Sequence, residues 1–194
     1  MKIIYTIYFK SDRLKVIILI SYEYLKTNRK IKLKEITFFD KETNTIAYIK
    51  RENLVLVKDK NQIEYKEIQV VKELIQNYLA GTDINLYDKV KELDIDLSIV
   101  EKFPTKFSQD VIKHLSNLKK GEVTTYSEIG KNINSKAYRA IGTVLKRNSL
   151  PLIIPCHRVI RKDGKIGGFM GETKSSWQQQ LKKDLLELEQ IKVN

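Results

Sequence analysis

The hydrophobic positions in the first sixty residues fall in short runs of β-branched and aromatic residues, which are typical of strands. Residues 3–9 and 14–21 are two such runs, and the polar residues between them predict a β-hairpin. Residues 46–49 and 54–58 predict two further strands, and polar, lysine-rich connections join the segments. We therefore expect a small sheet at the start of the chain.

From residue 64 the apolar positions recur at steps of three and four, which predicts an amphipathic helix over residues 64–79 that packs on the sheet. Gly81 follows as a natural C-terminal stop for this helix. Residues 82–104 are polar and acidic and end at Pro104, so we expect them to link two domains.

The second half of the chain has the pattern of several helices. Ser108 is a candidate N-cap for a helix that ends at Gly121, and His114, on the side away from its apolar face, is expected to have no chemical role. The last stretch predicts a C-terminal helix packed on the core. Its apolar positions have near-helical spacing: Trp177, Leu181, Leu185 and Leu188.

Between these helices the pattern favours a helix-turn-helix. Ser127 is a candidate N-cap for a short helix, residues 132–135 interrupt it, and a second helix follows at about 136–147. The chain is thus predicted to be an α+β protein of two domains. Residues 1–98 form a small β-sheet and helix domain, and residues 99–194 form a mainly helical domain with a winged-helix-like helix-turn-helix.

The charge is distributed unevenly between the two halves. The net charge is +12, and residues 101–194 carry 18 Lys and Arg against 9 Asp and Glu. Residues 119–165 alone carry 11 basic and 3 acidic side chains. Such a concentration indicates a polyanionic partner such as nucleic acid, although a solvated lysine-rich surface would give the same count.

The soft ligands are few. One cysteine and two histidines exclude an intramolecular disulfide and a Cys/His zinc site, so no metal is expected. No run approaches the about 18 apolar residues that a membrane span needs. We therefore expect a soluble protein in the cytoplasm, or in the nucleus of a eukaryote, without a membrane or metal partner.

The single cysteine, Cys156, lies directly beside His157 at the end of an apolar run that two prolines, Pro151 and Pro155, keep stiff. A buried cysteine is most often structural. A thiol beside a base is also the arrangement from which a reactive thiolate can form.

The residues around Cys156 distinguish between these two interpretations. Pro-Cys-His-Arg-Val at 155–159, preceded by Arg139 and Asn148 and followed by Gly-Gly-Phe at 167–169, resembles the active-site region of the O6-alkylguanine-DNA alkyltransferases. That family repairs alkylated guanine by moving the alkyl group onto its own cysteine. The resemblance covers about residues 107–189, whereas residues 1–98 match only in length and general pattern.

The resemblance implies a set of catalytic roles. Cys156 would be the nucleophile, His157 its base through a bridging water, and Glu189 the carboxylate that orients the imidazole. The match of Glu189 requires an insertion after Gly171, so Glu187 and Glu172 are alternatives. Two further catalytic residues are implied: Tyr126, whose hydroxyl donates toward guanine N3, and Asn148, which braces the turn before the cysteine segment.

The resemblance also implies a DNA-binding surface and a substrate pocket. The second helix of the pair would dock in the minor groove, and Arg139 would fill the stack that a flipped nucleotide leaves. Tyr138 departs from the family, which usually has a small residue or proline there, and its ring would either block the groove or stack on DNA. The other implied DNA contacts are Tyr126, Ala137 and Ser108, and the implied pocket residues are Val159, Ile166, Gly167, Phe169 and Met170.

The implied activity is transfer of an alkyl group from O6-alkylguanine in double-stranded DNA to Cys156, by a monomer without a cofactor that turns over once. O4-alkylthymine is a further candidate substrate. We expect the alkylated protein to melt at a lower temperature. The rival hypotheses are a damage sensor that flips the base without reaction, a cysteine hydrolase, and a helix-turn-helix regulator.

Overall fold

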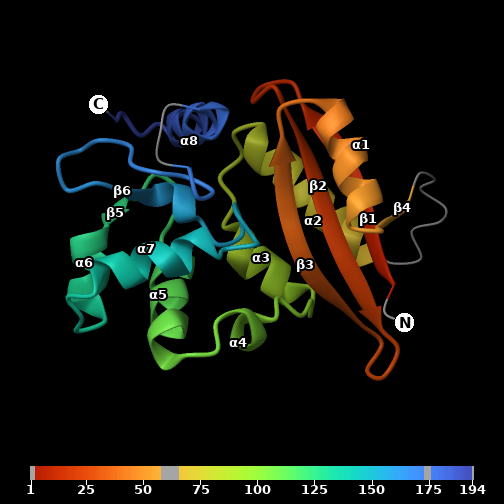
Figure 1. The fold of residues 1–194 in the computed structure, drawn as a ribbon, viewed down its shortest axis with the longest axis horizontal. Coiled ribbons are helices and arrows are strands. Elements are labelled where there is room, and N and C mark those ends of the chain that lie inside the picture. Colours follow the sequence, from red (N-terminus) through yellow and green to blue (C-terminus); the bar gives the residue numbers. More distant parts are fainter. Residues whose placement is uncertain (1–2, 58–65, 173–175, 194) are drawn as a thin grey trace. The chain divides into compact units, whose positions relative to one another are not determined.

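The structure is a computed structural model that describes residues 3–57, 66–172 and 176–193 (Figure 1). The chain divides into two compact units, Met1–Ser98 and Ile99–Asn194. The first unit contains a four-stranded sheet with the strand order β3-β2-β1-β4. Its elements are β1 (Ile4–Ser11), β2 (Val16–Leu25), β3 (Lys30–Phe39), α1 (Glu42–Arg51), β4 (Val55–Leu56), α2 (Lys66–Leu79) and α3 (Leu86–Glu92).

Helices cover both faces of this sheet. Tyr8 and Lys10 of β1 contact the Glu42 carboxylate at the start of α1, at 3.3 and 2.9 Å. Phe9, between them in the strand, lies under the Lys72 ammonium of α2, 5.9 Å from its ring centroid. Because neighbouring residues of a strand point to opposite faces, α1 and α2 pack on opposite sides, as the buried residues of β2 require.

Two predictions for this unit are confirmed. Strands β1 and β2 form the expected antiparallel hairpin, in which Ser11 pairs with Val16. Helix α2 ends as expected before Gly81, which has a φ of 104° and donates its amide to the Tyr78 carbonyl at 3.0 Å. Residues 64 and 65 of the predicted helix, and Lys58 of the last predicted strand, lie outside the described residues.

Other predictions for this part of the chain are wrong. Residues 46–49 lie in helix α1, because this short apolar run buries Thr45 and Ile49, one helical turn apart, instead of alternating positions. Strand β3 was taken for a polar connection, yet its lysines alternate with apolar residues that are buried. Residues 82–104 are not a plain linker, since they include α3, which buries Leu86 and Val90.

The second unit contains five helices among its described residues, with a short 3-10 turn and a two-stranded parallel pairing. Helices α5, α6 and α7 contact one another, and α6 and α7 form the predicted helix-turn-helix. The α+β fold class is thereby confirmed. The elements are α4 (Ile99–Lys102), α5 (Lys106–Ser116), β5 (Thr124–Thr125), α6 (Tyr126–Asn132), α7 (Tyr138–Lys146), the turn Cys156–Arg158, β6 (Val159–Ile160) and α8 (Trp177–Leu188).

The two predicted N-caps of this unit are wrong by a few residues. Helix α5 is capped by Thr105, whose hydroxyl accepts the Ser108 amide at 3.1 Å, and the helix ends at Ser116 instead of Gly121. Helix α6 is capped by Thr125, whose hydroxyl accepts the Glu128 amide at 3.2 Å. In both cases the threonine forms a capping box with the residue three positions later, which satisfies two amides instead of one.

None of the helices in residues 3–57, 66–172 and 176–193 has the length and apolar character needed to cross a membrane. Over the same residues, no group of three or more His, Cys, Asp and Glu side chains is placed to hold a metal ion.

Candidate active site

Cys156 is held at the start of a short 3-10 turn by the segment before it. Leu150, Ile153 and Ile154 of that segment are buried, so the backbone around the cysteine is embedded in the core of the unit. Asn148 braces the segment at both ends: its amide donates to the Ile154 carbonyl at 2.8 Å, and its oxygen accepts the Leu150 amide at 3.0 Å. The family resemblance implies a bracing role of this kind for Asn148.

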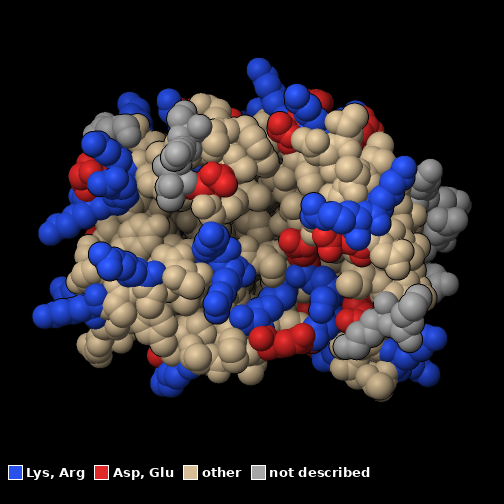
Figure 2. Space-filling model, viewed as in Figure 1, with Lys and Arg blue, Asp and Glu red and all other residues tan. Residues whose placement is uncertain are grey.

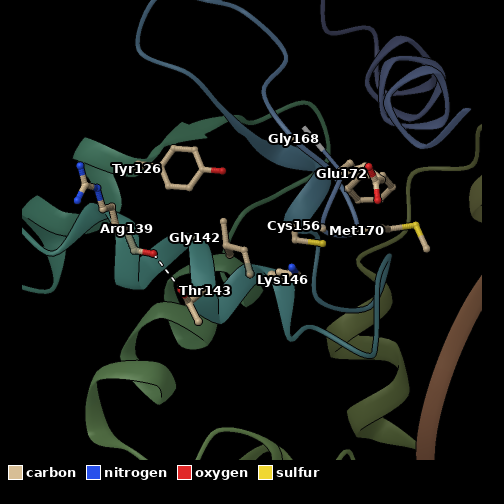
Figure 3. Close-up of a pocket in the computed structure, with 12 residues that line it drawn as sticks. Tyr126, Arg139, Gly142, Thr143, Lys146, Cys156, Gly168, Met170 and Glu172 are labelled. Carbon is tan, nitrogen blue, oxygen red and sulfur yellow. Dashed lines mark hydrogen bonds between the residues drawn. The ribbon is translucent and has the colours of Figure 1, made fainter. Parts of the chain in front are cut away.

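The strand that follows Cys156 positions the tyrosine of the site. Val159 of β6 pairs in parallel with Thr124 of β5, directly before Tyr126 at the start of α6. Tyr126 and Cys156 therefore line the same cavity of about 320 Å³. Figure 3 shows the tyrosine hydroxyl directed across this cavity from one wall, with Cys156 on another.

The remaining walls come from helix α7 and from the loop after β6. Phe169 and Met170, two of the predicted pocket residues, line the cavity, and so does Glu172. Ile166 and Gly167 instead line a neighbouring cavity that shares Gly168 with the first, and Val159 is 1% exposed. Of the five predicted pocket residues, the structure thus brings two to the cavity of Cys156.

Behind Cys156 lies a buried charged cluster. The His157 ring Nε2 is 3.0 Å from Glu189 Oε1, and both side chains are fully buried. Arg158 donates from Nε and Nη2 to the same carboxylate at 2.9 and 2.8 Å, and from Nη1 to the Leu118 carbonyl at 2.7 Å. The Gly121 amide is a further donor to the carboxylate, at 3.2 Å.

The carboxylate beside His157 is therefore Glu189 and not one of the two alternatives. Glu187 is more than half exposed and lies 3.8 Å from Lys183, and Glu172 is an exposed residue at the mouth of the cavity. Burial disfavours the charged form of Glu189, but the hydrogen bonds and charges of His157 and Arg158 outweigh it and hold the pKa of the carboxyl well below its ordinary value.

The protonation states follow from this burial. Burial lowers the pKa of His157, so the ring is neutral at pH 7 and donates Nε2–H to the ionised Glu189, which leaves the lone pair of a base on Nδ1. Burial raises the pKa of the Cys156 thiol, while the Asn148 side chain and the Lys182 charge act in the opposite direction. At rest the site holds a thiol, and thiolate formation requires transfer of its proton to a base.

Lys182 and Arg158 are the two site residues that the sequence analysis missed. Lys182 is 1% exposed, and its ammonium donates to the Val159 carbonyl at 2.6 Å and to the Gly168 carbonyl at 3.1 Å. It thereby ties the strand after Cys156 to the loop that forms the opposite wall of the cavity. Burial lowers the pKa of Lys182 to about 8. A sequence signal existed, since Lys182 lies in α8 seven residues, or about two helical turns, before Glu189, which directly follows that helix.

The predicted DNA-contacting residues fall into two groups. Tyr126, Tyr138 and Arg139 line a second cavity beside the first, and Ala137 is the exposed N-cap of α7. Ser108 is 7% exposed, and its hydroxyl is engaged in the cap of α5, where it donates to the Thr105 carbonyl at 2.8 Å. The structure does not bring Ser108 to either cavity.

Basic side chains surround this part of the surface. On the face that Figure 2 shows, Lys and Arg project around α6 and α7, with few acidic side chains among them. The fold and the site together define the class of protein: a helix-turn-helix protein with basic side chains around the helix pair, in which a cavity beside the second helix leads to a buried thiol.

Comparison with known proteins identifies the family. Residues 106–191 match the family model described as the DNA-binding domain of 6-O-methylguanine DNA methyltransferase. The methylated-DNA–protein-cysteine methyltransferase of Methanocaldococcus vulcanius is 35% identical over 127 residues, which cover 64% of this chain and 68% of the relative. The constitutive enzyme of Bacillus subtilis is 34% identical over 132 residues, 66% of this chain and 71% of the relative. That of Methanothermobacter thermautotrophicus is 41% identical over 101 residues, which span about half of each protein, 52% and 53%.

Solved structures align with nearly all of this chain. The Mycobacterium tuberculosis O6-methylguanine methyltransferase aligns with a TM-score of 0.64 and 22% identity over 96% of this chain and 93% of its own. The Pyrococcus kodakaraensis O6-methylguanine-DNA methyltransferase aligns with a TM-score of 0.63 and 22% identity over 97% and 100%. This chain belongs to the methylated-DNA–protein-cysteine methyltransferase family, and its membership supports DNA repair by alkyl transfer to a cysteine, with DNA as the partner.

Proposed function

We propose that this protein repairs double-stranded DNA by moving the alkyl group of O6-alkylguanine irreversibly onto Sγ of Cys156, once per molecule, as a monomer without a cofactor. The observation that carries the proposal is the position of the only cysteine of the chain, on a cavity of about 320 Å³ beside α7. Ligand pockets typically measure about 300 to 1,000 Å³, so the cavity has room for one modified base.

The chemistry is a displacement at saturated carbon. The S–C bond forms while the bond from the alkyl carbon to guanine O6 breaks, and the electron pair leaves on the base. His157 accepts the thiol proton through a water, and the ionised Glu189 stabilises the imidazolium that results. Arg158 has no substrate contact in this scheme and keeps Glu189 ionised and in place.

Tyr126 supplies the proton for the leaving base. Burial raises the pKa of its phenol, so the hydroxyl is protonated at pH 7 and can donate toward guanine N3. The guanine then leaves as a neutral base. The proton that His157 accepted from the Cys156 thiol makes up for the proton that Tyr126 donated. General acid catalysis of this kind is typically worth about 100- to 10,000-fold.

The alkylated base must leave the duplex to reach the sulfur, at a cost of a few kcal/mol. Helix α7 carries Arg139, which lines both cavities, and we assign it to the stack that the flipped nucleotide vacates. The basic surface of the second unit attracts the phosphates. Residues 1–98 have a structural role in this proposal. Because the substrate is DNA, we expect the protein in the cytoplasm, or in the nucleus of a eukaryote.

Intact-mass measurement tests the proposal directly. The purified protein is mixed with a duplex containing O6-methylguanine, alongside the Cys156→Ala variant and an unmodified duplex. We expect a gain of one methylene on the unmutated protein alone, with a stoichiometry of one. Lesion-selective binding without a mass gain would instead indicate the damage sensor, and further turnover with release of the alkyl group would indicate a hydrolase.

A further inference from the structure

A second cavity lies next to the one that contains the thiol. Its volume is about 630 Å³, and it is lined by the start of α6, the start of α7 and the turn after β6. Tyr126, Arg139 and Gly142 line both cavities. When a DNA strand places one nucleotide in the cavity of Cys156, a neighbouring nucleotide of the same strand can therefore reach the second cavity.

The wall of this cavity includes a tyrosine whose ring rests on the helix beside it. Tyr138 is the first residue of α7, and its side chain is 44% exposed. A Cβ atom added at Gly130 of α6 would lie 2.7 Å from Cε1 of the ring, so the ring packs directly against the backbone of α6. Gly130 thus makes room for the ring, which is supported on one side and accessible on the other.

The charges around the ring suit a nucleotide. Arg139, Arg161 and Lys162 line the cavity against one acidic residue, Asp163, which pairs with Arg161 at 3.2 Å. The residue that caps α7, Ala137, has no side-chain acceptor, so the positive end of this helix adds to the attraction for phosphate. An aromatic ring among cations is the arrangement by which proteins bind unpaired nucleic acid, because every base can stack and every nucleotide has a phosphate.

We propose that the second cavity binds an unpaired nucleobase next to the alkylated nucleotide in the same strand, stacked on Tyr138, with Lys162 at its phosphate. This inference rests on the proposed function, because it needs the lesion to occupy the first cavity. The site positions DNA and takes no part in the transfer. It favours lesions in single-stranded or locally unpaired DNA, where the neighbouring base need not be pulled from a pair.

Equilibrium binding tests the inference, with Cys156→Ala as the background so that no transfer occurs. Two duplexes contain O6-methylguanine beside an unpaired position, which holds a base in one and an abasic sugar in the other. Stacking on an aromatic side chain corresponds to about 5- to 160-fold in affinity. We expect the protein to bind the duplex with the base more tightly by a factor in this range.

Two substitutions identify the ring as the cause. Tyr138→Phe keeps a flat ring and should retain the difference between the duplexes, whereas Tyr138→Leu fills the space without a π face and should abolish it. Equal affinity of the unsubstituted background for both duplexes would overturn the inference without any change at Tyr138. So would a Tyr138→Leu variant that binds both duplexes more tightly, since the ring would then be an obstacle.

The mass measurement keeps this inference separate from the proposed function. Cys156-containing protein mixed with the same duplexes gains one methylene if the transfer occurs, whether or not the neighbouring base matters. A mass gain with equal affinities overturns only the second site, and the absence of a mass gain from every duplex overturns the proposed function.

Discussion

Replacement of the buried carboxylate, Glu189→Gln, should strongly destabilise the second unit. Glu189 is the common partner of His157 and Arg158, and its side chain has no exposed surface. The glutamine leaves the Arg158 guanidinium buried without a countercharge. Loss of one partner of a buried ion pair costs about 3 to 5 kcal/mol, which is a large part of the stability of most domains.

The same helix supplies a matched control and a reporter. Glu187→Gln removes an exposed carboxylate 3.8 Å from Lys183, and exposed pairs contribute about 0 to 1 kcal/mol. Trp177, the only tryptophan, begins α8, and Glu189 directly follows that helix. Urea denaturation monitored by tryptophan fluorescence therefore reports on the helix that contains Glu187 and that Glu189 directly follows.

The pH dependence gives the prediction a second readout. The folded-state pKa of Glu189 is depressed, so the stability it contributes is present above its ordinary pKa of 4.5 and is lost as the pH falls through the folded value. The difference in the free energy of unfolding between the wild type and Glu189→Gln should become smaller below about pH 4.5. The double variant Arg158→Met/Glu189→Gln should recover part of the loss, because no uncompensated charge is left. Equal free energies of unfolding for Glu189→Gln and Glu187→Gln at pH 7 would refute this account of the cluster.

Three further outcomes are expected. Methylation adds a carbon to Cys156, which is only 9% exposed although it lines the cavity, and should lower the free energy of unfolding by about 1 to 3 kcal/mol, measured on fully reacted protein; equal or greater stability would contradict this. Lys182→Met should remove a rise in stability between pH 8 and 10.5, because the buried amine has a pKa of about 8 against 10.5 when exposed; unfolding curves across this range check it, and an unchanged pH profile would rule it out. Gly130→Ala, whose Cβ would meet the Ser135 carbonyl at 2.5 Å, should destabilise by about 1 to 3 kcal/mol. Gly142→Ala, where the nearest contact is 3.7 Å, is its control, and equal effects of the two would argue against the clash.

Local sequence patterns predicted those parts of the fold in which the residue types and the spacing of the apolar positions indicate the same element. The β1–β2 hairpin, helix α2 with its stop at Gly81, and the helix-turn-helix all have signals within a few residues. Strand β3 and helix α1 were misassigned because their short apolar runs fit more than one period. Packing on β2 decided which structure each run adopts. The caps of α5 and α6 were misplaced because several nearby hydroxyls could cap, and the reciprocal bond decided in favour of Thr105 and Thr125.

For the site, the sequence by itself determined the nucleophile candidate and its setting: one cysteine, the adjacent histidine and the basic second half. The brace at Asn148 was implied by the family resemblance. The tertiary structure decided which groups meet. Glu189 is 32 residues from His157 in sequence yet bonded to it, and Lys182 crosses to two carbonyls on other segments. Spacing along one helix does not distinguish Glu187 from Glu189 as a partner for a distant ring. Burial and distance do, because a carboxylate is retained in a core only where donors from other segments converge on it.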